Sequence, residues 1–110
     1  MPSYLVQVSY TIAAVAAFIE SPQDRTDAIR KTVERLGGKL EKLYLSFGDY
    51  DVVGIYDMPN NVSAAAFAVA IKAGGVCKDV KTTPLISTKD GVTVLKKAAT
   101  SGYVPVTAKK

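Results

Sequence analysis

The sequence of 110 residues contains no histidine and no tryptophan, and its only cysteine is Cys77. Imidazole is the commonest metal ligand in proteins and the side chain whose ordinary pKa lies nearest neutrality. Its absence excludes histidine-dependent catalytic triads, histidine-ligated haem and most zinc or iron sites. A single thiol cannot form an intramolecular disulfide, so we expect a reducing, cytoplasmic location, and we expect neither a metal nor another cofactor.

Long apolar runs are also missing. The run from Ile12 to Ile19 has eight residues and no apolar run is longer, whereas a helix needs about 20 to span a bilayer. The opening residues MPSYLVQVSY lack the basic region with which a signal peptide begins. We therefore expect a soluble protein that does not associate with membranes.

The charge balance is weakly basic, with a formal net charge of +4. Four lysines lie within the last fifteen residues, and the rest of the chain is close to neutral without them. The basic character therefore belongs to the C-terminal segment and does not indicate a nucleic-acid surface.

An apolar content of 48% with 22% charged residues is typical of a globular protein. The length allows one domain over 1–110, with a mobile tail from about residue 101.

Periodicity and turn residues predict four strands and several helices. Bulky residues alternate with smaller ones from Tyr4 to Tyr10, as in a half-buried strand. Thr11 can cap an alanine-rich helix to Glu20, and Ser21 can cap a second helical segment that Gly37-Gly38 ends. The other predicted elements are strands over 39–47, 52–57 and 76–87, a helix that Asn61 or Ser63 caps and Gly74-Gly75 ends, and a final helix that Thr88 caps and that continues to about Thr100.

The segment Ser46–Pro59 indicates how the middle of the chain folds. Two apolar runs flank the residues Gly-Asp-Tyr-Asp at 48–51, a pattern that predicts a β-hairpin with carboxylates and a phenol at its turn. Pro84 lacks an amide donor, so the strand over 76–87 should lie at a sheet edge or contain a bulge.

The element order βαββαβ, followed by a terminal helix, predicts a ferredoxin-like α+β fold. In this fold a four-stranded antiparallel sheet carries both main helices on one face. The other face should be a mixture of apolar and polar side chains, which favours an interface over simple exposure. We therefore expect two such faces to stack in a homodimer, or in a higher homo-oligomer, around a partly lined lumen. The residues placed on this face are Gln7, Ser9, Leu40, Tyr44, Ser46, Tyr56 and either Lys81 or Thr83.

Several stretches resemble the GYD-domain family over nearly the whole chain. They are the opening PSYLVQVSYT, the helix end ERLGGKLE, the hairpin FGDYDVV, the helix start NNVSAAA and the strand KTTPLIST, together with the final helix through Gly102-Tyr103. The turn at 48–51 is the most specific of them. The resemblance implies the dimeric α+β-barrel superfamily, which includes cofactor-free monooxygenases, lactone isomerases and stress-related barrels. It implies a fold and leaves the activity open.

The candidate ligand-binding residues are Ser9, Tyr44, Tyr56, Asp51 and Lys81. Asp51, with Asp49, could form a carboxylate pair that handles a proton at the mouth of the lumen, or could serve only to stabilise the turn. The tyrosines could donate to a substrate oxygen or could simply pack. Lys81 could be a counter-ion for an anionic ligand. Cys77 is expected to behave as a small buried hydrophobe.

Three functions remain open at this point. The first is a barrel that binds a small apolar or aromatic ligand between paired sheets without turnover. The alternative is a cofactor-free monooxygenase or isomerase acting on a small aromatic or lactone substrate, in which Tyr44 or Tyr56 orients an oxygen and Asp51 moves the proton. RNA-recognition domains share the element order, but the strand DYDVVGIYD carries carboxylates at both ends instead of basic and aromatic residues. We therefore expect no nucleic-acid partner.

Overall fold

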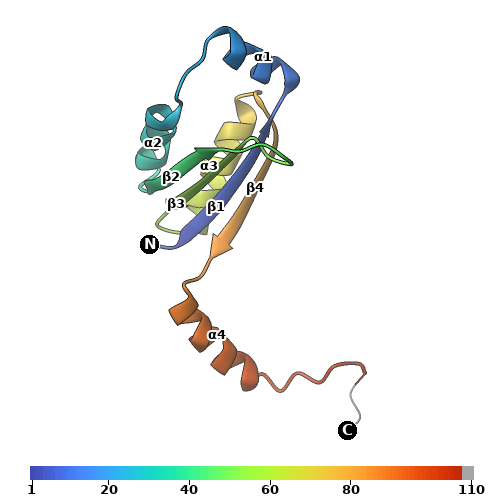
Figure 1. The fold of residues 1–110 in the computed structure, drawn as a ribbon. Helices are drawn as coiled ribbons and strands as arrows, with labels where there is room; N and C mark the ends of the chain where they lie inside the picture. Colours follow the sequence, from blue (N-terminus) through green and yellow to red (C-terminus); the bar gives the residue numbers. More distant parts are fainter. Residues whose placement is uncertain (108–110) are drawn as a thin grey trace.

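The computed structural model describes residues 1–107, which form four strands and four helices (Figure 1). The strands belong to one antiparallel sheet in the order β2-β3-β1-β4. This is the predicted ferredoxin-like α+β arrangement. The elements are β1 (Ser3–Tyr10), α1 (Ile12–Glu20), α2 (Thr26–Arg35), β2 (Lys39–Leu45), β3 (Val52–Asp57), α3 (Asn61–Ala73), β4 (Cys77–Leu85) and α4 (Thr88–Ala99).

The central strand β1 sets the register of the sheet. Tyr4 pairs with Tyr56 of β3 on one side and with Pro84 of β4 on the other. The strand that contains Pro84 is an outer strand, which confirms the prediction for that proline. The alternation in β1 also agrees with the prediction, because Tyr4, Val6 and Val8 are buried on the side that α2 and α3 cover.

Three helix starts are fixed by side-chain caps, and of the predicted N-caps only Thr11 is confirmed. The Thr11 hydroxyl accepts from the Ala14 amide at 3.1 Å, as expected for the start of α1. The caps predicted for α3 (Asn61 or Ser63) and for α4 (Thr88) are wrong, because Asn60 and Ser87 cap these helices. Ser21 is not the N-cap of a helix, since α2 begins only at Thr26 and Arg25 before it contributes no side-chain hydrogen bond. Ser21 is instead the C-cap of α1, where its amide donates to the Ala17 carbonyl oxygen at 2.9 Å.

The break between α1 and α2 has a local physical cause. The Asp24 carboxylate accepts from both the amide and the hydroxyl of Thr26, at 2.9 and 2.6 Å. An aspartate that turns back on the chain in this way competes with helical hydrogen bonding. The five residues 21–25 are therefore a connection, and α1 and α2 are separate helices.

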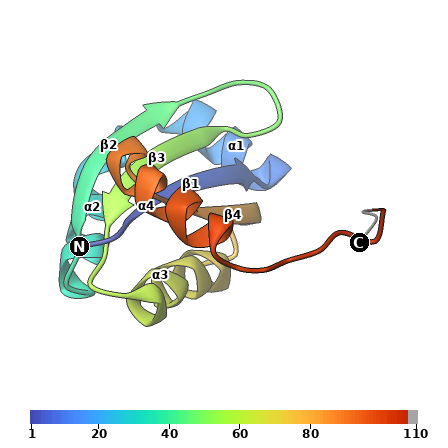
Figure 2. The ribbon, with the colours of Figure 1, turned by 90° about the horizontal axis from the view of Figure 1, so that it is seen from below.

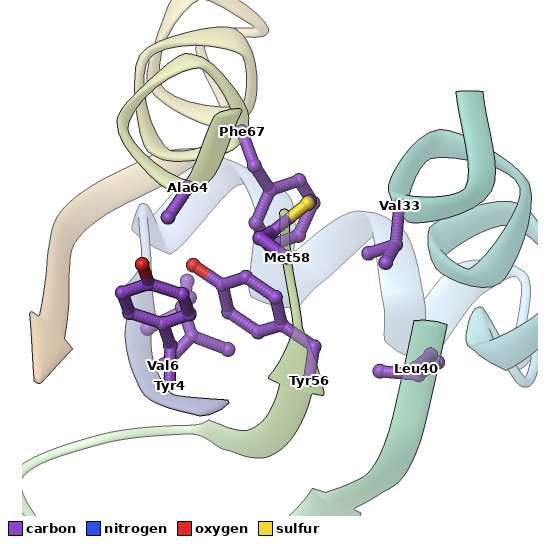
Figure 3. Packing of buried hydrophobic residues seen from close by; sticks show 9 residues of the cluster. Tyr4, Val6, Val33, Leu40, Tyr56, Met58, Ala64 and Phe67 are labelled. Carbon is purple, nitrogen blue, oxygen red and sulfur yellow. The ribbon is translucent and has the colours of Figure 1, made fainter. Parts of the chain in front are cut away.

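The buried core lies between the sheet and the helices and is centred at the Tyr4 end of β1, and Figure 3 shows its packing. Tyr56 is fully buried, with its ring 5.5 Å from that of Tyr4 in a stacked pair and 5.0 Å from that of Phe67 at a steep angle. Val33 from α2 and Met58 close the same cluster. Aromatic contacts of this kind contribute beyond the area that they bury, so we regard this end as the stable centre of the fold.

Helix α4 lies apart from the rest of the chain. It continues past the end of β4 and projects away from the sheet and the other helices (Figure 1). None of its residues is buried. The radius of gyration is 18.0 Å, whereas a compact chain of this length is expected near 13 Å. Within residues 1–107, no helix combines the length and apolar character required to cross a membrane.

Candidate functional site

The helix-free face of the sheet presents side chains in rows that cross all four strands. One row consists of Tyr44, Val53, Gln7 and Lys81, paired in that order from β2 to β4. The next row consists of Lys42, Ile55, Leu5 and Thr83. Leu5, Val53 and Ile55 are therefore neighbours at the middle of the face, and polar or charged residues lie toward both edges.

Three of the predicted ligand-binding residues share this face. Tyr44 and Lys81 occupy the two ends of the first row, and Ser9 lies one step along β1, opposite Asp79. The Tyr44 side chain is 58% exposed, and Lys81 is also exposed, whereas Ser9 is half-buried. The face thus combines an apolar middle with a phenol, a hydroxyl and an ammonium group around it.

The placement of Leu40 and Tyr56 on this face is wrong. Both are buried on the helix-covered side, where Leu40 pairs with Tyr56. The register of β2 shifts between Leu40 and Lys42. Side chains normally alternate between the two faces along a strand, and this irregularity shifts the alternation by one residue. Leu40 therefore does not share a face with Tyr44. In β3 nearly every position is apolar, and alternation alone could not show which way Tyr56 points.

Tyr56 has no evident catalytic partner. Its hydroxyl and that of Thr82 are both buried, and neither makes a hydrogen bond of acceptable geometry. Burial raises the pKa of the Tyr56 phenol, the Thr82 hydroxyl opposes this shift, and Tyr4 adds slightly to it. The two hydroxyls are thus close enough to influence each other without forming a good hydrogen bond. Tyr44 and Tyr56 lie on opposite faces and cannot orient the same substrate.

Asp51 makes local contacts that hold the hairpin to the central strand. Its carboxylate accepts from the Tyr10 amide at 2.7 Å, and its own amide donates to the Val8 carbonyl oxygen at 2.8 Å. The Ser46 amide donates to the Asp51 carbonyl oxygen at 2.8 Å. Asp49, in contrast, is exposed. These contacts fit the turn-stabilising alternative for Asp51, and the two carboxylates do not act on a common hydrogen-bond partner.

A hollow of about 940 Å³ lies on the helix-covered side of the sheet, beside the filled core. Sequence reasoning missed it, because no motif marks it. Its lining includes small residues on both covering helices, Ala28 of α2 and Ala70 of α3, and its rim includes Arg25. Small residues at positions that face a sheet were the one available signal, and they are equally typical of close helix packing.

No group of three or more cysteine, aspartate or glutamate side chains within residues 1–107 is arranged to hold a metal ion. Cys77 is a free thiol. Burial raises its pKa, which lowers the fraction of reactive thiolate at neutral pH.

The sheet order and the helix placement define an α+β protein of the ferredoxin-like type. The family model described as GYD domain matches residues 4–95. Because this match covers most of the 110 residues, the chain belongs to the GYD domain family, which confirms the resemblance inferred from its sequence. No curated protein sequence matches the chain.

Proposed function

We propose that this chain works as a homodimer, or as a larger homo-oligomer of such dimers, in which the helix-free faces of two sheets pack together around a small apolar or aromatic ligand. The observation that carries this proposal is the apolar centre of that face, formed by Leu5, Val53 and Ile55. Within residues 1–107, helices α1, α2 and α3 do not cover this face of the sheet (Figure 2). Contiguous apolar surface of this kind is typical of interfaces and ligand grooves.

The side chains around this centre support a ligand between the sheets. Tyr44 offers an exposed ring and a hydroxyl, Ser9 offers a second hydroxyl, and Lys81 offers a positive charge. A few polar groups around an apolar surface are the usual composition of a small-molecule site.

The free thiol of Cys77 is the reason for proposing a cytoplasmic location.

Helix α4 supports a second copy as the partner. A helix of twelve residues is marginally stable by itself in water and normally depends on packing. Val92 and Leu95 lie one turn apart and are 51% and 71% exposed. Since α4 projects beyond the sheet that precedes it, the partner subunit is the surface against which we propose that it packs.

The oligomeric state can be tested by light scattering coupled to gel filtration. We expect twice the monomer mass of 11.7 kDa at about 100 μM. Val53→Glu should yield a folded monomer, because it buries an unpaired charge in the interface. Val69→Glu is the matched control, since Val69 is exposed on α3 and should remain dimeric. A wild-type chain that stays monomeric at this concentration refutes the proposal.

The role of α4 has its own measurement. Leu95→Glu should raise the dimer dissociation constant at least about tenfold, because burying a leucine contributes about 1.5–3 kcal/mol. Unchanged dimerisation of this variant would exclude α4 from the interface while leaving the sheet pairing in place.

Ligand binding can be tested with 1-naphthol, a neutral aromatic probe. In an amide NMR titration of the wild-type chain, we expect shifts at Gln7 and Tyr44, and we expect them to disappear in the Val53→Glu monomer. The ligand part of the proposal fails if 1-naphthol causes no shifts at about 1 mM, or if the monomer binds it equally well.

A further inference from the structure

The hollow on the helix-covered side exists because of where the helices pack. Helix α2 contacts β2 and helix α3 contacts β4, and these are the two outer strands of the sheet. The central strands β1 and β3 therefore face a space between α2 and α3. Their side chains Val6, Val8 and Val52 line the resulting space, whose volume is about 940 Å³. Small-molecule sites usually have volumes of about 300–1,000 Å³.

The lining of the hollow is predominantly apolar. Leu43 of β2, Ile29 of α2 and Ile71 of α3 add to the valines of the central strands. Phe67, a buried core residue, lies where the hollow adjoins the core. Protein interiors are normally packed as densely as organic crystals, so this apolar space has room for another apolar body.

The far end of the hollow is closed by an aromatic pair and carries polar groups. The rings of Tyr10 and Phe18 lie 5.1 Å apart, with Phe18 coming from α1. Tyr10 is half-buried and lines the hollow. Burial raises the pKa of this phenol, Cys77 and Asp51 act in the same direction, and Arg25 opposes them. The phenol is therefore protonated at neutral pH, and it has a cation nearby.

The charges around the hollow favour an anion. Arg25, Lys31 and Arg35 line it, whereas the only lining carboxylate is that of Asp24, which already accepts two hydrogen bonds from Thr26. Among the described residues, the ion pairs within 4.0 Å join Arg30 to Asp27 and Lys39 to Glu41. The three lining cations thus have no carboxylate partner within that distance. Arginine is especially suited to a carboxylate, because it can donate two parallel hydrogen bonds.

We propose that this hollow is a second binding site, and that it takes a medium-chain carboxylate. The alkyl chain lies over the valines of the central strands and against Phe67, and the carboxylate lies at the end formed by Arg25 and Tyr10. Because the space is large and mostly apolar, it fits an alkyl chain better than a small inorganic anion. The site is on the opposite side of the sheet from the proposed subunit interface, so it does not depend on dimerisation.

The charge requirement can be tested with three probes that share one alkyl chain. Decanoate, decanol and decyltrimethylammonium are titrated into the full chain, and binding is followed by amide NMR. We expect decanoate to bind about tenfold more tightly than decanol and decyltrimethylammonium to bind most weakly. Equal affinities for the three probes, or no binding of decanoate at about 1 mM, would overturn the proposal.

Substitutions locate the site and separate it from the interface. Arg25→Gln should remove the preference for decanoate over decanol. Arg30→Gln should preserve it, because Arg30 lies on the helix α2 that follows Arg25 and pairs with Asp27 outside the hollow. Ala70→Phe should abolish binding of both probes by filling the space. The Val53→Glu chain should bind decanoate as well as the wild type does. Loss of binding in that variant, or shifts confined to the helix-free face, would contradict the assignment.

Discussion

Replacing Tyr56 by phenylalanine removes one oxygen atom from the centre of the filled core. In the native chain that oxygen is buried beside the Thr82 hydroxyl without a hydrogen bond of acceptable geometry. An unsatisfied buried polar group costs about 1–3 kcal/mol. Tyr56→Phe retains the ring contacts with Tyr4 and Phe67, so we expect it to raise the free energy of unfolding by about 1 kcal/mol. For a domain of this size, that corresponds to a rise in Tm of about 4 °C.

The stacked neighbour provides a control with the opposite sign. The Tyr4 hydroxyl donates to the Asn61 side-chain oxygen at 2.6 Å and so ties β1 to the start of α3. Tyr4→Phe should therefore lower the free energy of unfolding by about 1 kcal/mol. Urea denaturation followed by circular dichroism measures both variants. If Tyr56→Phe is the less stable of the two, the buried hydroxyl must have a partner and our reasoning about it is wrong.

Alkaline pH provides an independent measurement on the same residue. Because burial raises the pKa of Tyr56 above its ordinary value of 10.0, the unfolded chain loses this proton at a lower pH than the folded chain does. Stability is therefore complete below about pH 10 and falls as the pH rises further. Tyr10 contributes in the same direction. We expect Tyr56→Phe to lose less stability than the wild type between about pH 10 and 11, and an unchanged slope would refute this.

Two further pairs of variants test the turn and the glycines. Asp51→Ala should lower the free energy of unfolding by about 1–2 kcal/mol, because the Asp51 carboxylate accepts a hydrogen bond from a β1 amide. Asp49→Ala, at the exposed turn, should have little effect. Equal urea midpoints for the two variants would contradict this. Gly38→Ala should cost about 2 kcal/mol or more, since its Cβ would lie 2.3 Å from the Asp57 carbonyl oxygen. Gly91→Ala has open space and should increase the helical circular dichroism signal, and a destabilised variant would argue against the position of α4.

The fold could be predicted from the sequence where local signals agree with one another. The strand Val52–Asp57 lies between a glycine-containing turn and a proline, and it was predicted with its correct bounds. Gly37 ends α2 with a φ of 86°, as the pair of glycines indicated. Each of these features is set by the conformation of a few consecutive residues, which is information that a single sequence carries.

The errors concern features set by contacts between distant residues. The face of Tyr56 depends on its pairing with Tyr4 and on its packing against Phe67. The start of α2 depends on whether Asp24 bonds to Thr26 or lies in the first turn of a helix. The hollow depends on how far apart two helices pack. None of these is encoded in a run of neighbouring residues, so the candidate site was predicted less completely than the fold.

The uneven filling of the helix-covered side has a consequence for how the molecule opens. The two ends of β1 lie over different environments, a tightly packed aromatic cluster near Tyr4 and the hollow near Tyr10. Local opening requires less free energy where fewer apolar contacts must be broken. Amide hydrogens around the aromatic cluster should therefore exchange only through global unfolding, while those near Tyr10 exchange through smaller fluctuations. A guest molecule could thus enter or leave at that end while the rest of the domain stays folded.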